Sequence, residues 1–128
     1  MSKYLPLAYN EPCMHEFVAT VKDLKKSHKI KAYDVGKALL DKGFHSPTIY
    51  FPLIVEEALM FEPTETQTVE TLDDLAESNQ HIIEELCAPG VNLTDYPKNL
   101  PVGRPNELIP AKHLTVHWGD FELLELTE

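Results

Sequence analysis

The sequence is poor in cysteine, glycine and positive charge, and it has no long hydrophobic run. Its 128 residues include two cysteines and five glycines, and 21 acidic residues outnumber 11 lysines and arginines, for a net charge of −10. Nucleic-acid phosphates and anionic membrane surfaces attract clustered lysine and arginine, so we expect neither as a partner. No apolar stretch approaches the roughly 20 residues that a membrane-spanning helix needs.

The two cysteines, Cys13 and Cys87, are too few for a disulfide framework and too far apart for a Cys-x-x-Cys motif. Reduced thiols are the rule in the cytosol, and the amino terminus has no long apolar segment of the secretory kind. We therefore expect a cytoplasmic protein. With 43% hydrophobic and 25% charged residues, the chain has an ordinary composition for one soluble domain with its own core.

Hydrophobic periodicity predicts an α+β fold. Helical spacing indicates a helix over residues 33–42 and a stronger one over residues 67–86, capped by Thr66 or Thr68. The lysine-rich segment 23–31 is expected to be a loop or a frayed turn rather than a binding patch. Alternation and β-branched content indicate three short strands, over residues 15–21, 48–51 and 58–62. We expect these strands to form a small, mostly antiparallel sheet packed against the two helices.

We interpret the chain as a single domain, 1–128, with four parts. These are an extended leader over 1–12, the α+β core over 13–88, an irregular proline-rich segment that wraps a larger body over 89–118, and an extra C-terminal tail over 119–128. Two alternating stretches, 114–118 and 121–126, predict a terminal hairpin that could extend the sheet.

The most distinctive stretch is residues 44–65, FHSPTIYFPLIVEEALMFEPTE, in which three prolines interrupt a strand-like apolar run. CMHEFV at residues 13–18, DVGKALLDKGFH at 34–45 and LPVGR at 100–104 accompany it. Together these motifs resemble the C-terminal domain of the pyridoxal-phosphate-dependent glycine dehydrogenase (decarboxylating), the P-protein of the glycine cleavage system. YFPLIVEEALM is similar to the separate second subunit of two-subunit bacterial versions.

The resemblance implies an oxidoreductase of glycine catabolism. The whole enzyme decarboxylates glycine on pyridoxal phosphate and passes the aminomethyl group to the lipoyl arm of the H-protein. It implies a large pyridoxal-phosphate-binding domain or subunit and the lipoyl H-protein as partners, and a homodimer stays open. In the fold, it implies the small C-terminal domain of fold-type-I pyridoxal-phosphate enzymes.

The family's Schiff-base lysine lies in the large domain, in a His-Lys loop that a glycine-rich loop follows. The only His-Lys pair here, His28-Lys29, lies in a charged linker without such a loop. We therefore expect this chain alone to bind no cofactor and to have no catalytic residue, because cofactor chemistry needs both the electron sink and a fold that orients it.

By resemblance, five residues are candidates for access of the substrate or the carrier: His45, Thr48, Glu62, Thr64 and Glu65. A purely local role is the alternative for most of them. His45 could cap the preceding helix, and Glu62, Thr64 and Glu65 could belong to the turn from strand into helix.

Two histidine patterns have partial metal-ligand spacing, Cys13-x-His15 and His113-x3-His117. In a strand, residues i and i+4 are more than about 12 Å apart, and no second cysteine or carboxylate pair stands at ligand spacing. We predict no metal site.

Three accounts of the chain stay open. It is a fragment of the glycine dehydrogenase, or a stand-alone binding or regulatory module that docks on glycine dehydrogenase or the H-protein, or an independent small enzyme or metal protein that reuses the domain. An excised domain would expose an apolar patch where its partner sat, whereas the leucine-rich residues 119–128 could cover such a patch.

Overall fold

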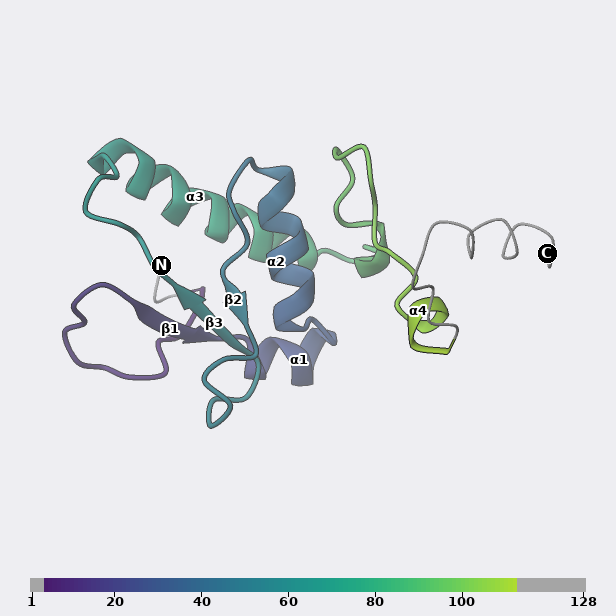
Figure 1. Ribbon diagram of the computed structural model, residues 1–128, viewed down its shortest axis with the longest axis horizontal. Coiled ribbons are helices and arrows are strands. Elements are labelled where there is room, and N and C mark those ends of the chain that lie inside the picture. The colour runs from purple at the N-terminus through teal and green to yellow at the C-terminus, as the bar shows by residue number, and fades with distance from the viewer. Residues whose placement is uncertain (1–3, 113–128) are drawn as a thin grey trace.

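The computed structural model describes residues 4–112, and its centre is a three-stranded antiparallel sheet of order β1-β3-β2. The strands are β1 (Phe17–Thr20), β2 (Thr48–Ile49) and β3 (Ala58–Phe61). The two main helices, α2 (Ala32–Asp41) and α3 (Val69–Leu86), pack on one another, and α2 contacts β2 and β3. Figure 1 shows the helices together on one side of the sheet. The predicted α+β fold is confirmed, and the bounds of these five elements differ from the predicted ones by no more than two residues.

The prediction of a loop over residues 23–31 is wrong, because a helix, α1 (Lys22–His28), occupies most of it. Its only half-buried apolar side chain is Leu24, so seven residues carry too little periodicity to reveal a helix. The macrodipole favours the charge order, with Asp23 in the first turn and basic residues in the last. Lys29 ends the helix in the left-handed region, at φ 64°.

The segment after α3 is mostly irregular, as predicted, but it contains two short helical turns. These are a 3-10 turn, η1 (Leu93–Asp95), and a short helix, α4 (Leu108–Lys112). The terminal hairpin expected over 114–118 and 121–126 lies outside the described residues.

The strand register aligns apolar side chains across the sheet. Phe17 lies opposite Phe61, their rings stacked with centroids 5.1 Å apart, and Ala19 lies opposite Leu59. The leader adds to the free edge of β1, because the N–H of Ala8 donates to the carbonyl of Val18 at 2.8 Å. The leader, β1, β3 and β2 are therefore joined side by side by backbone hydrogen bonds.

The core lies between the sheet and the two main helices. Its fully buried large apolar side chains come from the leader, β3, the two main helices and the short connections on either side of α1: Leu5, Leu59, Val35, Leu39, Ile82, Val21 and Ile30. The apolar stripe of α3 is buried only in its C-terminal half. Val69 and Leu72 in its first two turns are 69% and 38% exposed, so the stripe extends beyond what this domain covers.

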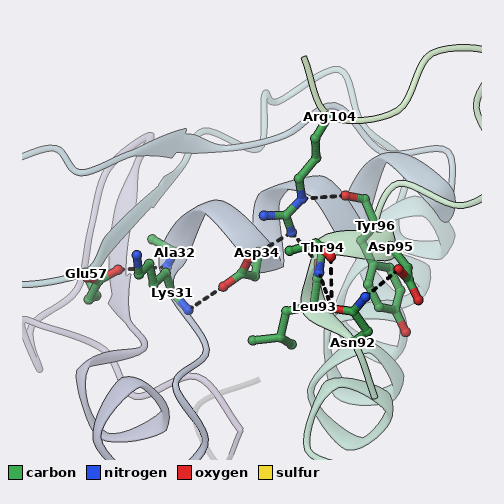
Figure 2. A network of polar contacts seen from close by, with 10 residues as sticks. All are labelled: Lys31, Ala32, Asp34, Glu57, Asn92, Leu93, Thr94, Asp95, Tyr96 and Arg104. Atoms are coloured by element: carbon green, nitrogen blue, oxygen red, sulfur yellow. Dashed lines mark hydrogen bonds and ion pairs between the residues drawn. The ribbon is translucent and has the colours of Figure 1, made fainter. Parts of the chain in front are cut away.

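Helix α2 begins without a side-chain acceptor at its own N-cap, Lys31. Two carboxylates instead accept hydrogen bonds from the N–H groups that have no partner within the helix. Asp34 accepts from the N–H of Lys31, and Glu57 accepts from the N–H of Ala32, each at 2.8 Å (Figure 2). Glu57 comes from the loop before β3, so the start of α2 depends on a residue 25 positions away.

Candidate functional site

A groove of about 600 Å³ lies between the loop that follows α2, the end of β3 and the first turns of α3. Four of the five candidate residues, His45, Thr48, Glu62 and Thr64, line it. Glu65 is exposed and does not line it. The fold thus brings together side chains from two segments, the one that follows α2 and the one that follows β3.

Local structure explains this convergence. Gly43, at φ +82°, ends α2 and turns the chain toward His45. Thr48 at the start of β2 pairs with Met60 of β3, so the loop with His45 lies beside the segment that leaves β3. Pro63 then stops the strand, since proline cannot continue a ladder.

Thr64 has the local role that the turn alternative describes. Its carbonyl accepts from the N–H of Gln67 at 3.1 Å, and its hydroxyl shares a hydrogen bond with Thr66 at 2.8 Å. Thr68 caps α3 by accepting from the N–H of Thr71 at 3.2 Å, which is one of the two caps that the sequence predicts. Thr64 therefore shapes the groove wall even without a ligand.

His45, Thr48 and Glu62 have no such local explanation. All three are exposed, and within residues 4–112 their side chains make no hydrogen bond or ion pair. In particular, no hydrogen bond joins the imidazole of His45 to the end of α2 in this part of the chain. These polar groups are free to bind something that enters the groove.

The groove has an apolar side and a polar rim. The apolar side consists of side chains from the sheet, the loop and α3: Phe44, Met60, Phe61, Leu72 and Leu75. The polar rim consists of the His45 imidazole, the Glu62 carboxylate, the Gln67 amide and several hydroxyl groups. Such a surface suits a ligand with an apolar stem and a polar end. No nucleophile and base among its lining residues are hydrogen-bonded to one another, so the groove shows no catalytic pair.

The described residues do not fit pyridoxal phosphate. A Schiff base needs a lysine amine inside the site, and no lysine of residues 4–112 lines the groove. Lys37 lies over the ring of Tyr33, 5.2 Å from its centroid, and Lys42 pairs with Glu85 at 3.7 Å. The groove therefore offers no amine for a Schiff base.

Within residues 4–112, no three His, Cys, Asp or Glu side chains gather in a way that could hold a metal ion. His113 and His117 lie outside these residues, so the absence of a metal site stays a prediction. No helix in the same part of the chain is long and apolar enough to cross a membrane.

Sequence reasoning noted Arg104 in the LPVGR motif but gave it no role, and the structure makes it a central contact. Its guanidinium pairs with Asp34 at 2.7 Å and donates to the carbonyls of Tyr96, at 2.7 Å, and Leu93 (Figure 2). It also lies over the ring of Tyr33, 4.9 Å from its centroid. Arg104 therefore ties the irregular segment to the start of α2.

A second set of contacts fixes the same segment to α2 and α3. Asp41 accepts from the N–H groups of Lys98, at 2.6 Å, and Asn99, at 2.9 Å. The buried hydroxyl of Tyr96 donates to Glu85, and this hydrogen bond, together with Lys98, holds the pKa of Glu85 below its ordinary value. The proline-rich segment is thus fastened by side chains, since it has little regular structure of its own.

Comparison with known proteins shows what this domain is related to. Residues 2–100 match the family model described as glycine dehydrogenase, C-terminal domain. The chain belongs to this family. The match covers β1 through η1 and includes both walls of the groove.

Curated relatives of this glycine dehydrogenase C-terminal domain are named "probable glycine dehydrogenase (decarboxylating) subunit 2". The Thermotoga maritima protein is 43% identical over 118 residues, covering 92% of this chain and 25% of that protein. The Caldanaerobacter subterraneus subsp. tengcongensis protein is 48% identical over 115 residues, covering 90% of this chain and 24% of that protein. The chain therefore spans about a quarter of the length of the curated relatives it matches.

Proposed function

We propose that this chain acts as the small C-terminal domain of a decarboxylating glycine dehydrogenase and that a larger pyridoxal-phosphate-binding part completes it. Membership of the family and the quarter share of the relatives' length support this proposal. The groove lacks a lysine, which supports the view that the chain alone does not catalyse the reaction. The partner then supplies the cofactor, and this domain supplies a shaped wall.

The groove is the part of the domain that we assign to access of glycine or of the lipoyl arm of the H-protein. The observation that carries this assignment is the convergence of His45, Thr48, Glu62 and Thr64 on one groove, three of them without any partner within residues 4–112. A lipoyl arm has long methylene stretches, and its aminomethylated form ends in an amine, which matches the apolar side and polar rim. Glu65 does not line the groove, so we assign it no direct contact with the ligand.

A fusion protein tests the function as a whole. The C-terminal quarter of the Thermotoga maritima subunit 2 is replaced by this chain, and the fusion is combined with its partner subunit, lipoylated H-protein and pyridoxal phosphate. We expect glycine-dependent exchange of labelled bicarbonate, and none from this chain alone. A folded fusion that binds the cofactor but supports no exchange would contradict the proposal. Inhibition of an intact enzyme by the free chain would indicate a regulatory module instead.

Matched substitutions in the same fusion test the groove. We expect H45A and E62Q each to raise the KM for lipoylated H-protein or for glycine at least fivefold, because each removes an unpaired polar group from the rim. H81A and E77Q on the exposed side of α3 are the controls and leave both KM values unchanged, since neither residue lines the groove. All four residues are exposed, so thermal unfolding does not change. If H45A and E62Q behave like the controls, the groove has no role in access.

We also propose that the domain works in the cytoplasm. Both cysteines are unpaired thiols, with Cys13 exposed and Cys87 half-buried, which suits a reducing compartment.

A further inference from the structure

The loop between β2 and β3 carries a cluster of exposed apolar side chains, Tyr50, Phe51, Leu53 and Ile54, which we call the apolar tip. Leu53 and Ile54 are 87% and 85% exposed, and Phe51 is 51% exposed. Figure 1 shows this loop projecting away from the sheet on the side opposite the helix α3. Single exposed apolar residues are ordinary, but four within five consecutive positions form a patch of the kind that marks an interaction site.

The tip is held in one shape by backbone contacts. The N–H of Tyr50 donates to the carbonyl of Ala58 at 2.9 Å and closes the loop, and the N–H of Val55 donates to the carbonyl of Pro52 at 3.0 Å within it. Tyr50 and Glu57, at the two ends, have φ values of 59° and 52°. Such values are costly for residues other than glycine and persist only where the surroundings impose them.

The base of the loop is anchored to the rest of the domain by two glutamates. The carbonyl of Glu56 accepts from the hydroxyl of Thr20 at 2.7 Å. The buried carboxylate of Glu57 caps α2 through the N–H of Ala32 and pairs with Lys25 at 2.7 Å. A loop that is fixed at its base and apolar at its end loses little conformational entropy when it binds a partner.

We propose that the apolar tip inserts into an apolar pocket on the larger pyridoxal-phosphate-binding part of glycine dehydrogenase. This inference rests on the proposed function, and the share of the relatives' length supports it, because about three quarters of each relative lies beyond the region that matches this chain. A domain that forms a quarter of a folded subunit needs a surface that faces the rest.

One observation favours this occupant over a second copy of the chain, and it is the charge. Charged side chains that pair with one another, Lys22, Lys25 and Glu56, lie beside the base of the tip and supply the polar rim that any such interface needs. The net charge of −10 opposes close approach of two copies. The tip and the groove also lie at opposite ends of the β2–β3 pair, so docking through the tip leaves the groove open.

Hydrogen exchange locates the contact directly. Deuterium uptake of residues 50–57 is compared between the free chain and the Thermotoga maritima fusion described above. We expect uptake at Phe51, Leu53 and Ile54 to be at least tenfold slower in the fusion. Equal uptake overturns the tip as the docking surface, even if the fusion catalyses bicarbonate exchange. Slow uptake in an inactive fusion supports the docking and contradicts only the proposed function.

A pair of double variants gives the second measurement. L53S/I54S removes apolar surface from the tip, whereas M14S/V102S removes it from two positions elsewhere that are 98% and 73% exposed. We expect L53S/I54S to abolish the tenfold protection of residues 50–57. We also expect protease to cleave this domain from the L53S/I54S fusion at least tenfold faster than from the unchanged fusion. M14S/V102S should have neither effect. If the free chain forms a dimer that L53S/I54S dissociates, the tip binds a second copy and the proposal is wrong.

Discussion

Arg104 and Asp34 are 70 residues apart in the sequence, and their side chains meet at 2.7 Å with 19% and 7% of their surfaces exposed. The same aspartate also accepts from the N–H of Lys31 and so helps to start α2. One carboxylate therefore serves both the first turn of a core helix and the attachment of the irregular segment. An ion pair of this kind contributes little net free energy as a pair, but leaving one partner alone is costly.

We expect R104M to lower the free energy of unfolding by about 2–4 kcal/mol, because the substitution leaves Asp34 buried without its positive partner. This loss of unfolding free energy is smaller than for a fully buried pair, because Arg104 retains some exposure to water. Urea unfolding of the 128-residue chain measures it. As a control, K26M removes the exposed pair with Asp23, 3.8 Å apart, and costs less than about 1 kcal/mol. Equal effects of the two substitutions would contradict this account of Arg104.

The pH dependence of stability contains a contribution from Glu85. Its pKa is lower in the folded protein than the ordinary value of 4.5, chiefly because the hydroxyl of Tyr96 donates to it, with Lys98 also contributing. The ionised form therefore favours the folded state above pH 4.5, and this contribution disappears as the pH falls through the lower folded pKa. We expect the E85Q variant to lose less stability than the wild type between pH 5 and pH 3, as measured by urea unfolding.

Removing the hydroxyl gives an independent test of the same relationship. In Y96F the largest cause of the shift is gone, so the pKa of Glu85 rises toward 4.5 in an NMR titration. An unchanged pKa would assign the shift to Lys98 and Lys42 instead.

The sequence was sufficient for the parts of the fold that rest on local periodicity. Helix α3 repeats its apolar stripe over five turns and begins at a threonine cap, so both its type and its start could be predicted. β1 lies in a segment whose side chains alternate between two faces, and β3 is a short apolar run between turn residues, so both could be predicted as strands. Helix α1 was missed because its seven residues carry a single apolar side chain, Leu24, and because the pair between Lys25 and Glu57 that supports it comes from elsewhere in the sequence.

The candidate site could be predicted only in part. A family resemblance pointed to His45, Thr48, Glu62 and Thr64, but their convergence depends on the β2–β3 register, which pairs Thr48 with Met60. Nothing in the proline-rich sequence shows which carboxylate Arg104 meets, because contacts at such separation depend on the whole packed fold. The same limit applies to the tip, whose exposure is a property of the finished surface.

Asn79 is a polar residue in the core whose full hydrogen-bonding capacity is not used. It is 1% exposed, its amide donates to the carbonyl of Leu75 at 2.8 Å, and its side-chain oxygen has no partner within residues 4–112. We expect N79L, whose side chain has the same branching and the same number of heavy atoms, to leave stability unchanged or raise it by up to about 2 kcal/mol, because it removes an unsatisfied acceptor. Thermal unfolding measures this. A loss of more than about 1 kcal/mol would show that this oxygen has a partner in solution.

Gly36 allows the loop that carries His45 to lie directly against helix α2. A Cβ atom at this position would be 2.6 Å from the hydroxyl oxygen of Ser46 and 3.5 Å from Ile49. Alanine normally stabilises a helix interior by about 1 kcal/mol relative to glycine. Here we expect G36A to lose that gain of about 1 kcal/mol, because the Ser46 hydroxyl has to rotate away and give up its hydrogen bond to the carbonyl of Pro47.

A double-mutant cycle separates these two effects of Gly36. S46A removes the hydroxyl oxygen, so G36A/S46A should recover the helical preference and be more stable than S46A by about 0.5–1 kcal/mol. The non-additive term measured by urea unfolding then reports the contact between Gly36 and Ser46. In the fusion enzyme, G36A should also raise the KM that H45A raises, because Ser46 adjoins His45. If G36A alone is stabilising and leaves that KM unchanged, the loop adapts freely and its close approach to α2 does not set the shape of the groove.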